Sequence, residues 1–122
     1  MSVLVDRIGD TVVSCSAGAL SKDDIATLAQ ELSDESTAFY IAGAEGDVAM
    51  DSACRNLLFG LLRKRGIRVL AVCDSKVVRG IVTAAMWMGV SAHAKSWQEI
   101  EDHASNDIAL GLLKKQRDAC HA

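Results

Sequence analysis

The sequence predicts a single α/β domain built on a mixed sheet of four to five strands. The chain has 122 residues and half of them are hydrophobic, which is enough for one core. Segments with strand and helix character alternate in the order β-β-α-β-α-β-α-β-α, a pattern typical of a sheet with helices packed on it through right-handed crossovers. The two opening strands follow one another closely, so they form a hairpin and make the sheet mixed.

The first third of the chain predicts this hairpin and one helix. The β-prone segments "SVLVDR" and "TVVSC" are separated by a turn at Gly9-Asp10. The stretch "SAGAL" then breaks the strand pattern. Residues 21–32 have the apolar spacing of an amphipathic helix, with Ser21 as the N-cap and acidic side chains in the first turn.

The central third predicts two strands around a helix. Residues 37–42, "TAFYIA", read as a short apolar strand, and residues 43–47, "GAEGD", as a loop. A helix with a leucine stripe follows and ends in a basic turn at 63–65 before Gly66, a typical residue after a helix. The β-branched segment 67–73, "IRVLAVC", predicts a central strand.

The last third predicts three helices and one strand. Residues 77–88 form a helix that ends at Gly89, and "VSAHA" is a short final strand. Ser96 and Glu99 form a capping box that opens the next helix. Another helical segment, from about residue 106, extends the chain to its end.

Composition argues against several classes of function. The net charge is −3 and no basic stripe is interleaved with aromatic residues, so we expect no nucleic-acid partner. The chain shows neither a signal peptide nor an apolar run of about 20 residues, so we expect a cytoplasmic protein that does not insert into membranes.

Metal and cofactor sites are not predicted either. The cysteines, Cys15, Cys54, Cys73 and Cys120, contain no C-x-x-C pair, and the histidines form no two-ligand motif. We therefore expect no bound metal, and we interpret the cysteines as small buried apolar residues. No glycine-rich nucleotide motif is present, so we also expect no cofactor.

Two strand-to-helix junctions carry the same dipeptide, Asp51-Ser52 and Asp74-Ser75. Asp and Ser are preferred N-caps, so helix capping explains both. Because ligands favour the carboxyl ends of strands in α/β sheets, a small-ligand or enzymatic site near Cys73, Asp74 and Ser75 is an alternative. No nucleophile elbow of the form G-x-S-x-G is present, and we predict no catalytic residue and no enzyme.

The stretch "VAMDSACRNLLFGLLRKRGIRVLAVC" resembles the STAS domain, the family of bacterial anti-sigma-factor antagonists. An apolar residue, Asp-Ser, a small residue, a leucine-rich helix with a basic end, a glycine and an apolar strand follow in the family's order. The resemblance extends from about residue 3 to about residue 103. It implies one STAS-like domain over 1–122, with helices packed mainly on one face and the C-terminal helical extension. Cys54 stands where the family usually has glycine, and Gly43 where it usually has aspartate.

The resemblance implies a non-enzymatic, regulatory protein-binding module. Ser52 matches the position that is phosphorylated in switchable members, and the partner surface would comprise Asp51, Ser52, Ala53, Cys54, Asp74 and Ser75. The partners implied are a histidine-kinase-like serine kinase, an anti-sigma factor or other STAS-like proteins, including further copies of this chain.

An unswitched scaffold or assembly subunit is the alternative within the same fold. For the stretch "AAMWMGV", with Trp87 and Met88, two interpretations remain open. It is a partly exposed contact surface, or it is ordinary packing in the core or at the end of a helix.

Overall fold

The computed structural model describes residues 3–101 and 107–121, which contain five strands and five helices. The strands are β1 (Val3–Ile8), β2 (Thr11–Ala19), β3 (Phe39–Ala49), β4 (Arg68–Val72) and β5 (Ser91–Lys95). The helices are α1 (Lys22–Leu32), α2 (Ser52–Arg65), α3 (Lys76–Trp87), α4 (Trp97–Glu101) and α5 (Ile108–His121). Among these described helices, none combines the length and the apolar character that a membrane crossing requires.

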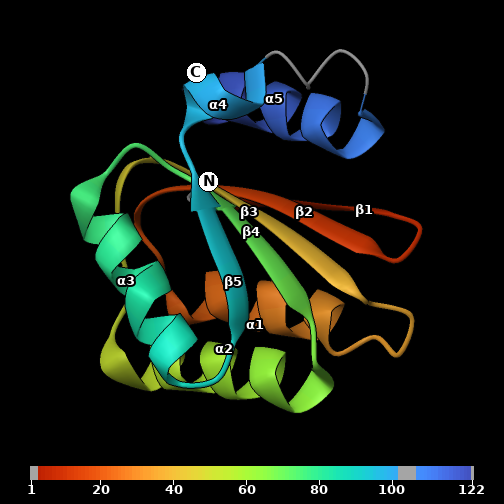
Figure 1. Ribbon diagram of the computed structural model, residues 1–122, viewed down its shortest axis with the longest axis vertical. Coiled ribbons are helices and arrows are strands. Elements are labelled where there is room, and N and C mark those ends of the chain that lie inside the picture. Colours follow the sequence, from red (N-terminus) through yellow and green to blue (C-terminus); the bar gives the residue numbers. More distant parts are fainter. Residues whose placement is uncertain (1–2, 102–106, 122) are drawn as a thin grey trace.

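The five strands form one mixed sheet in the order β1-β2-β3-β4-β5. β1 pairs antiparallel with β2, as the predicted hairpin requires, and every other neighbouring pair is parallel. Because each parallel strand lies beside the previous one, right-handed crossovers place α1, α2 and α3 on the same face of the sheet (Figure 1). The predicted fold class, a mixed sheet with helices mainly on one face, is confirmed.

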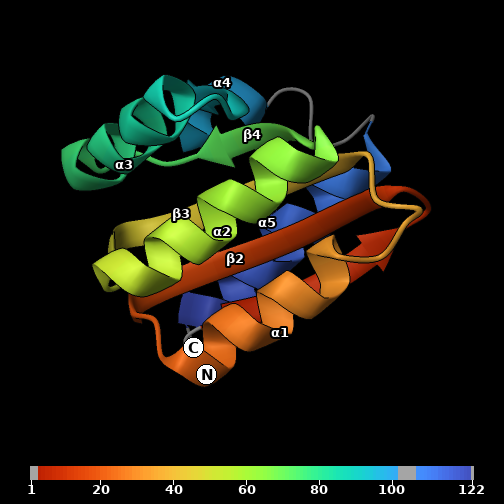
Figure 2. The same cartoon turned by 90° about the horizontal axis from the view of Figure 1, so that it is seen from below.

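The other face of the sheet is covered by α4 and α5. Figure 2 shows α5 behind the strands, with α1 and α2 in front of them. Each face has its own apolar cluster: one joins the sheet to α1, α2 and α3, and the other joins it to α4 and α5. The predicted C-terminal extension was placed from about residue 106, which lies outside the described residues; α5 begins at Ile108. This second layer was not predicted from the sequence.

The predicted loop at 43–47 is wrong, because β3 continues through it to Ala49. β3 pairs with β2 as far as Ala17 opposite Glu45, and pairing resumes with Gly18 opposite Val48. Two extra residues, Gly46 and Asp47, are therefore accommodated in β3 as a bulge. The glycine signal in the sequence marks this bulge, since Gly46 has a φ of 66°. β2 likewise continues through the predicted break, to Ala19.

The predicted helix ends are confirmed by their hydrogen bonds. Ser21 forms a capping box with Asp24 at the start of α1. Ser96 and Glu99 exchange two backbone-to-side-chain hydrogen bonds of 3.2 and 3.1 Å before α4. α2 ends at Gly66, which has a left-handed φ of 64°.

Gly43 allows the C-terminal layer to approach the sheet. A Cβ atom at this position would lie 2.6 Å from Leu113 Cδ1 and 2.9 Å from the Trp97 ring. Both side chains are buried, and the indole N–H of Trp97 donates a 2.9 Å hydrogen bond to the Ala44 carbonyl. The missing side chain at Gly43 therefore leaves the space that Trp97 and Leu113 fill.

We predict opposite effects for two glycine substitutions. Gly43→Ala is expected to lower the free energy of unfolding by about 1–3 kcal/mol, because the new methyl group overpacks the interface with α4 and α5. Gly60→Ala is the matched control: Gly60 lies inside α2, and a Cβ there meets nothing within 4 Å. It is expected to stabilise by about 0.5–1 kcal/mol through helix propensity. Urea unfolding followed by circular dichroism measures both, and equal effects would contradict the close approach at Gly43.

Candidate functional site

Helices α1, α2 and α3 all begin at the same edge of the sheet, where β2, β3 and β4 end. This geometry follows from the parallel pairing of those three strands. It brings both Asp-Ser junctions to one edge and adds Lys22, the first residue of α1, to it. We call this region the helix-start edge.

Asp51 is the N-cap of α2. Its Oδ1 atom accepts a 2.7 Å hydrogen bond from the Cys54 backbone N–H. This bond is the main cause that lowers the pKa of the Asp51 carboxyl, and the nearby Lys22 ammonium lowers it further. Asp51 is therefore an ionised, exposed cap, with a cation from the neighbouring helix close to it.

Ser52 is the first residue of α2 and is exposed. Within the described part of the chain, its hydroxyl has no hydrogen-bond partner. Ala53 is also exposed, whereas Cys54 is half-buried and packs against the core beneath α2. The cap thus uses Asp51 and leaves the Ser52 hydroxyl available on the surface.

The absence of glycine at position 54 does not strain this turn. Among the described residues, only glycines have a positive φ. Cys54 lies within the first turn of α2, in ordinary helical backbone that any residue can adopt. The departure from the family pattern at Cys54 is therefore compatible with the local backbone.

At the second junction, the side chains of Asp74 and Ser75 both form hydrogen bonds with neighbouring elements of the fold. Ser75 is the N-cap of α3, where its Oγ atom accepts from the Val78 N–H at 3.3 Å and donates to the Asp47 carboxylate. Asp74 accepts a 3.2 Å hydrogen bond from the Trp97 backbone N–H. These contacts connect the β3 bulge, α3 and α4.

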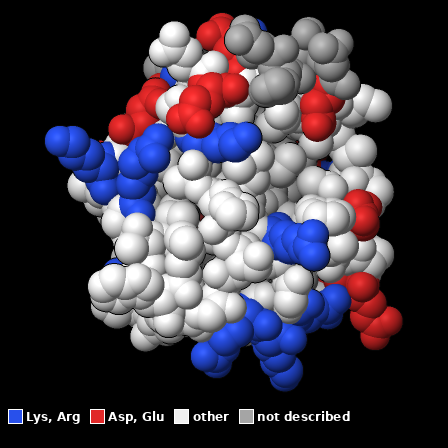
Figure 3. Space-filling model, viewed as in Figure 1, with Lys and Arg blue, Asp and Glu red and all other residues white. Residues whose placement is uncertain are grey.

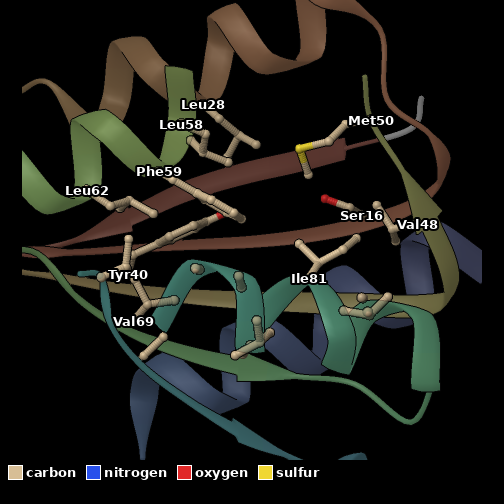
Figure 4. Close-up of a pocket in the computed structure, with 18 of the residues that line it drawn as sticks. Ser16, Leu28, Tyr40, Val48, Met50, Leu58, Phe59, Leu62, Val69 and Ile81 are labelled. Carbon is tan, nitrogen blue, oxygen red and sulfur yellow. The ribbon is translucent and has the colours of Figure 1, made fainter. Parts of the chain in front are cut away.

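An apolar cavity of about 100 Å³ lies between the sheet and the helices (Figure 4). Its walls include Leu58 and Phe59 from α2 and Ile81 from α3. Tyr40 also lines it, with its hydroxyl 2.7 Å from Ser14 Oγ, and burial raises the pKa of Tyr40 to about 12. Its lining is almost entirely apolar, and Cys73, Asp74 and Ser75, the residues of the small-ligand alternative, are not part of it.

The end of α3 carries exposed apolar side chains. Trp87 is 88% exposed, Met86 50% and Met88 39%. Figure 3 shows a largely uncharged area over the lower part of α3, bordered below by lysine and arginine side chains. Of the two interpretations of this stretch, core packing is wrong for Trp87, which lies on the surface. We call Met86, Trp87 and Met88 the α3-end patch.

The cysteines are separate and reduced in the described residues. Cys15 and Cys73 are fully buried, as predicted for small apolar residues, while Cys54 and Cys120 are only half-buried. Burial raises the pKa of Cys73. In the described ranges, no group of three or more ligating side chains is arranged to hold a metal ion.

Sequence reasoning missed two residues of the helix-start edge. Lys22 belongs to no motif that the sequence analysis singled out, although a helix that follows a parallel strand must begin at this edge. Asp47 was assigned to a loop, whereas the β3 bulge aims it at Ser75. The strand order alone would have placed Lys22 at this edge. The position of Asp47 depends on the β3 bulge, which the sequence does not reveal.

A comparison with solved structures matches the chain to the anti-sigma factor antagonist SpoIIAA in its unphosphorylated form. The TM-score is 0.54 at 16% sequence identity, and the match covers 86% of this chain and 99% of the other. No protein-family model matches the sequence, and no curated protein matches it either. At this identity the likeness shows the fold, and it confirms the resemblance to STAS domains at that level.

We predict that Asp51 stabilises α2 in a pH-dependent manner. Asp51→Ala is expected to lower the midpoint of urea unfolding at neutral pH. Asp51→Asn should lower this midpoint only slightly, because Asn also caps helices. The folded-state pKa of Asp51 lies below its ordinary value of 3.8, so the ionised form contributes stability above that pH. This contribution is lost as the pH falls through the folded-state pKa. Urea titrations of both variants at neutral and acidic pH test this, and a pH-independent deficit in Asp51→Asn would contradict it.

Proposed function

We propose that the chain is a regulatory protein-binding module of the anti-sigma-factor-antagonist kind, with Ser52 as its phosphoacceptor. The observation that carries this proposal is the exposed Ser52 hydroxyl at the start of α2, which has no partner within residues 3–101 and 107–121, in a chain with the SpoIIAA fold. The kinase and the phosphatase are separate proteins, so the switch requires no catalytic residue in this chain.

A phosphate on Ser52 would change the surface more than the fold. It adds about −1.5 to −2 charges at neutral pH. The helix N-terminus and the Lys22 ammonium favour this charge, while the ionised Asp51 carboxylate opposes it. The Cys54 N–H is already occupied by Asp51, so the phosphate would extend outward from the exposed side chain.

The proposed partner surface is the helix-start edge. Asp51, Ser52 and Ala53 are its exposed part at α2, and Asp74 is exposed at the second junction. A partner packed over α2 would desolvate the Ser52 hydroxyl. A phosphate dianion on Ser52 would then be buried in the interface. It would destabilise the complex far more than it destabilises the free domain. Binding is then lost without unfolding.

We predict that Ser52 is the single phosphorylated residue. Wild type, Ser52→Ala and Ser75→Ala are each incubated with ATP and a soluble extract of the source organism, and intact mass and phosphopeptides are measured. One phosphate is expected on the wild type and on Ser75→Ala, and none on Ser52→Ala. Ser75 is the matched control, because it follows the same Asp but its hydroxyl caps α3. Equal phosphorylation of wild type and Ser52→Ala would overturn the assignment.

An unswitched assembly module is the second candidate, and the α3-end patch favours it. Trp87 presents a large apolar surface to solvent, and exposed aromatic residues of this kind are typical of interface hot spots. This role is independent of Ser52. The patch lies at the end of α3, and the two junctions lie where α2 and α3 begin.

We predict that Trp87 is required for any self-association of the chain. Trp87→Ala is expected to weaken association by about tenfold or more, and Ser52→Ala to leave it unchanged. Val77→Ala is the matched control, since Val77 is also exposed on α3 but lies at its other end. Sedimentation velocity over a range of protein concentrations measures association. A monomer at every concentration in all variants would sink this candidate.

A further inference from the structure

Two cysteines far apart in the sequence meet where α5 packs on β2. Cys15 lies in β2 and Cys120 near the end of α5, 105 positions later. The Cys120 thiol donates a 3.5 Å hydrogen bond to the Cys15 carbonyl. Burial raises the pKa of Cys15 most, and the neighbouring Cys120 thiol raises it further.

The two thiols differ in access to solvent. Cys15 is fully buried, and burial is the main cause that raises its pKa to about 12. Cys120 is half-buried and lies at the margin of the same interface. Glu45 and Arg117 are the charged groups that act on Cys15, and they pair with each other at 2.5 Å. An oxidant in solution therefore reaches Cys120 first.

The contacts of α5 hold this pair in a fixed arrangement. Gln116, one turn before Cys120, donates 3.0 Å hydrogen bonds to Asp6 Oδ2 and to the Val13 carbonyl. Arg117 stacks over the Trp97 ring, 4.2 Å from its centroid. α5 cannot slide along β2 without breaking these contacts, so the Cys120 side chain stays against Cys15.

We propose that Cys15 and Cys120 form a redox-sensitive pair that a peroxide converts to a disulfide fastening α5 to β2. The Cys120 sulfur attacks one peroxide oxygen, the O–O bond breaks, and a sulfenic acid and one water are formed. The Cys15 sulfur then attacks the Cys120 sulfur, the S–O bond breaks, and hydroxide leaves with the Cys15 proton as a second water. Both thiols are oxidised, and the two electrons reduce hydrogen peroxide to water.

The bond would close almost the whole chain into one loop. A cross-link stabilises mainly by restricting the unfolded chain, and its effect increases with loop length. It would fix the layer that covers the sheet face opposite α1, α2 and α3. Oxidation by peroxide would therefore hold α5 more firmly against the sheet. Ser52, at the helix-start edge, would remain accessible to phosphorylation.

The experiment uses the full chain carrying Cys54→Ser and Cys73→Ser, so that only the pair remains. The folded protein is treated with hydrogen peroxide, alkylated, and analysed by intact mass and by peptide mapping without reductant. The expected product has lost two hydrogens and links the Cys15 and Cys120 peptides. Its Tm is expected to rise by on the order of 10 °C, and reductant should reverse the change.

The same protein with Cys120→Ser is the control, and it should keep a free Cys15 thiol and an unchanged Tm. Cys15→Ala should instead leave Cys120 to proceed to sulfinic acid, because no second thiol can displace the sulfenic oxygen. The proposal is overturned if peroxide gives sulfinic acid at Cys120 with Cys15 intact, or a cross-link between two chains. It is also overturned if the disulfide forms but lowers the Tm, since a strained bond would not fasten α5.

Discussion

The parallel pairing of β2, β3, β4 and β5 in sequence order is the constraint on which the rest of the structure depends. Each of these strands lies next to the one before it, so each crossover makes the same right-handed step. Three consequences follow together. Helices α1, α2 and α3 share one face, their first turns share one edge, and the opposite face is left for the C-terminal part of the chain to cover.

The covering of that opposite face depends on side-chain volume. β3 presents Ile41, Gly43 and Glu45 toward α4 and α5, and the middle position has no side chain. Trp97 and Leu113 fill the space above it. Gly43 thus has a packing role in this chain, because its missing side chain lets α4 and α5 approach the sheet.

Local signals in the sequence were sufficient for most elements but not for the tertiary features. Caps at Ser21, Ser96 and Gly66 depend on short-range hydrogen bonds, so the sequence predicts them well. The bulge at Gly46 was missed because a glycine in a turn and a glycine in a bulge look alike without knowledge of the partner strand. The packing of α5 on β2 connects residues about 100 positions apart, and no local pattern encodes such a contact.

At the two Asp-Ser junctions, the helix begins one residue apart relative to the dipeptide, so a different side chain caps each helix. α2 starts at Ser52, so Asp51 is the cap, and the serine hydroxyl has no hydrogen-bond partner among the described residues. α3 starts at Lys76, so Ser75 itself is the cap and its hydroxyl is already hydrogen bonded. The same dipeptide therefore gives one exposed hydroxyl and one occupied hydroxyl at the same edge. Sequence alone cannot tell them apart, because both registers satisfy the helix N-terminus equally well.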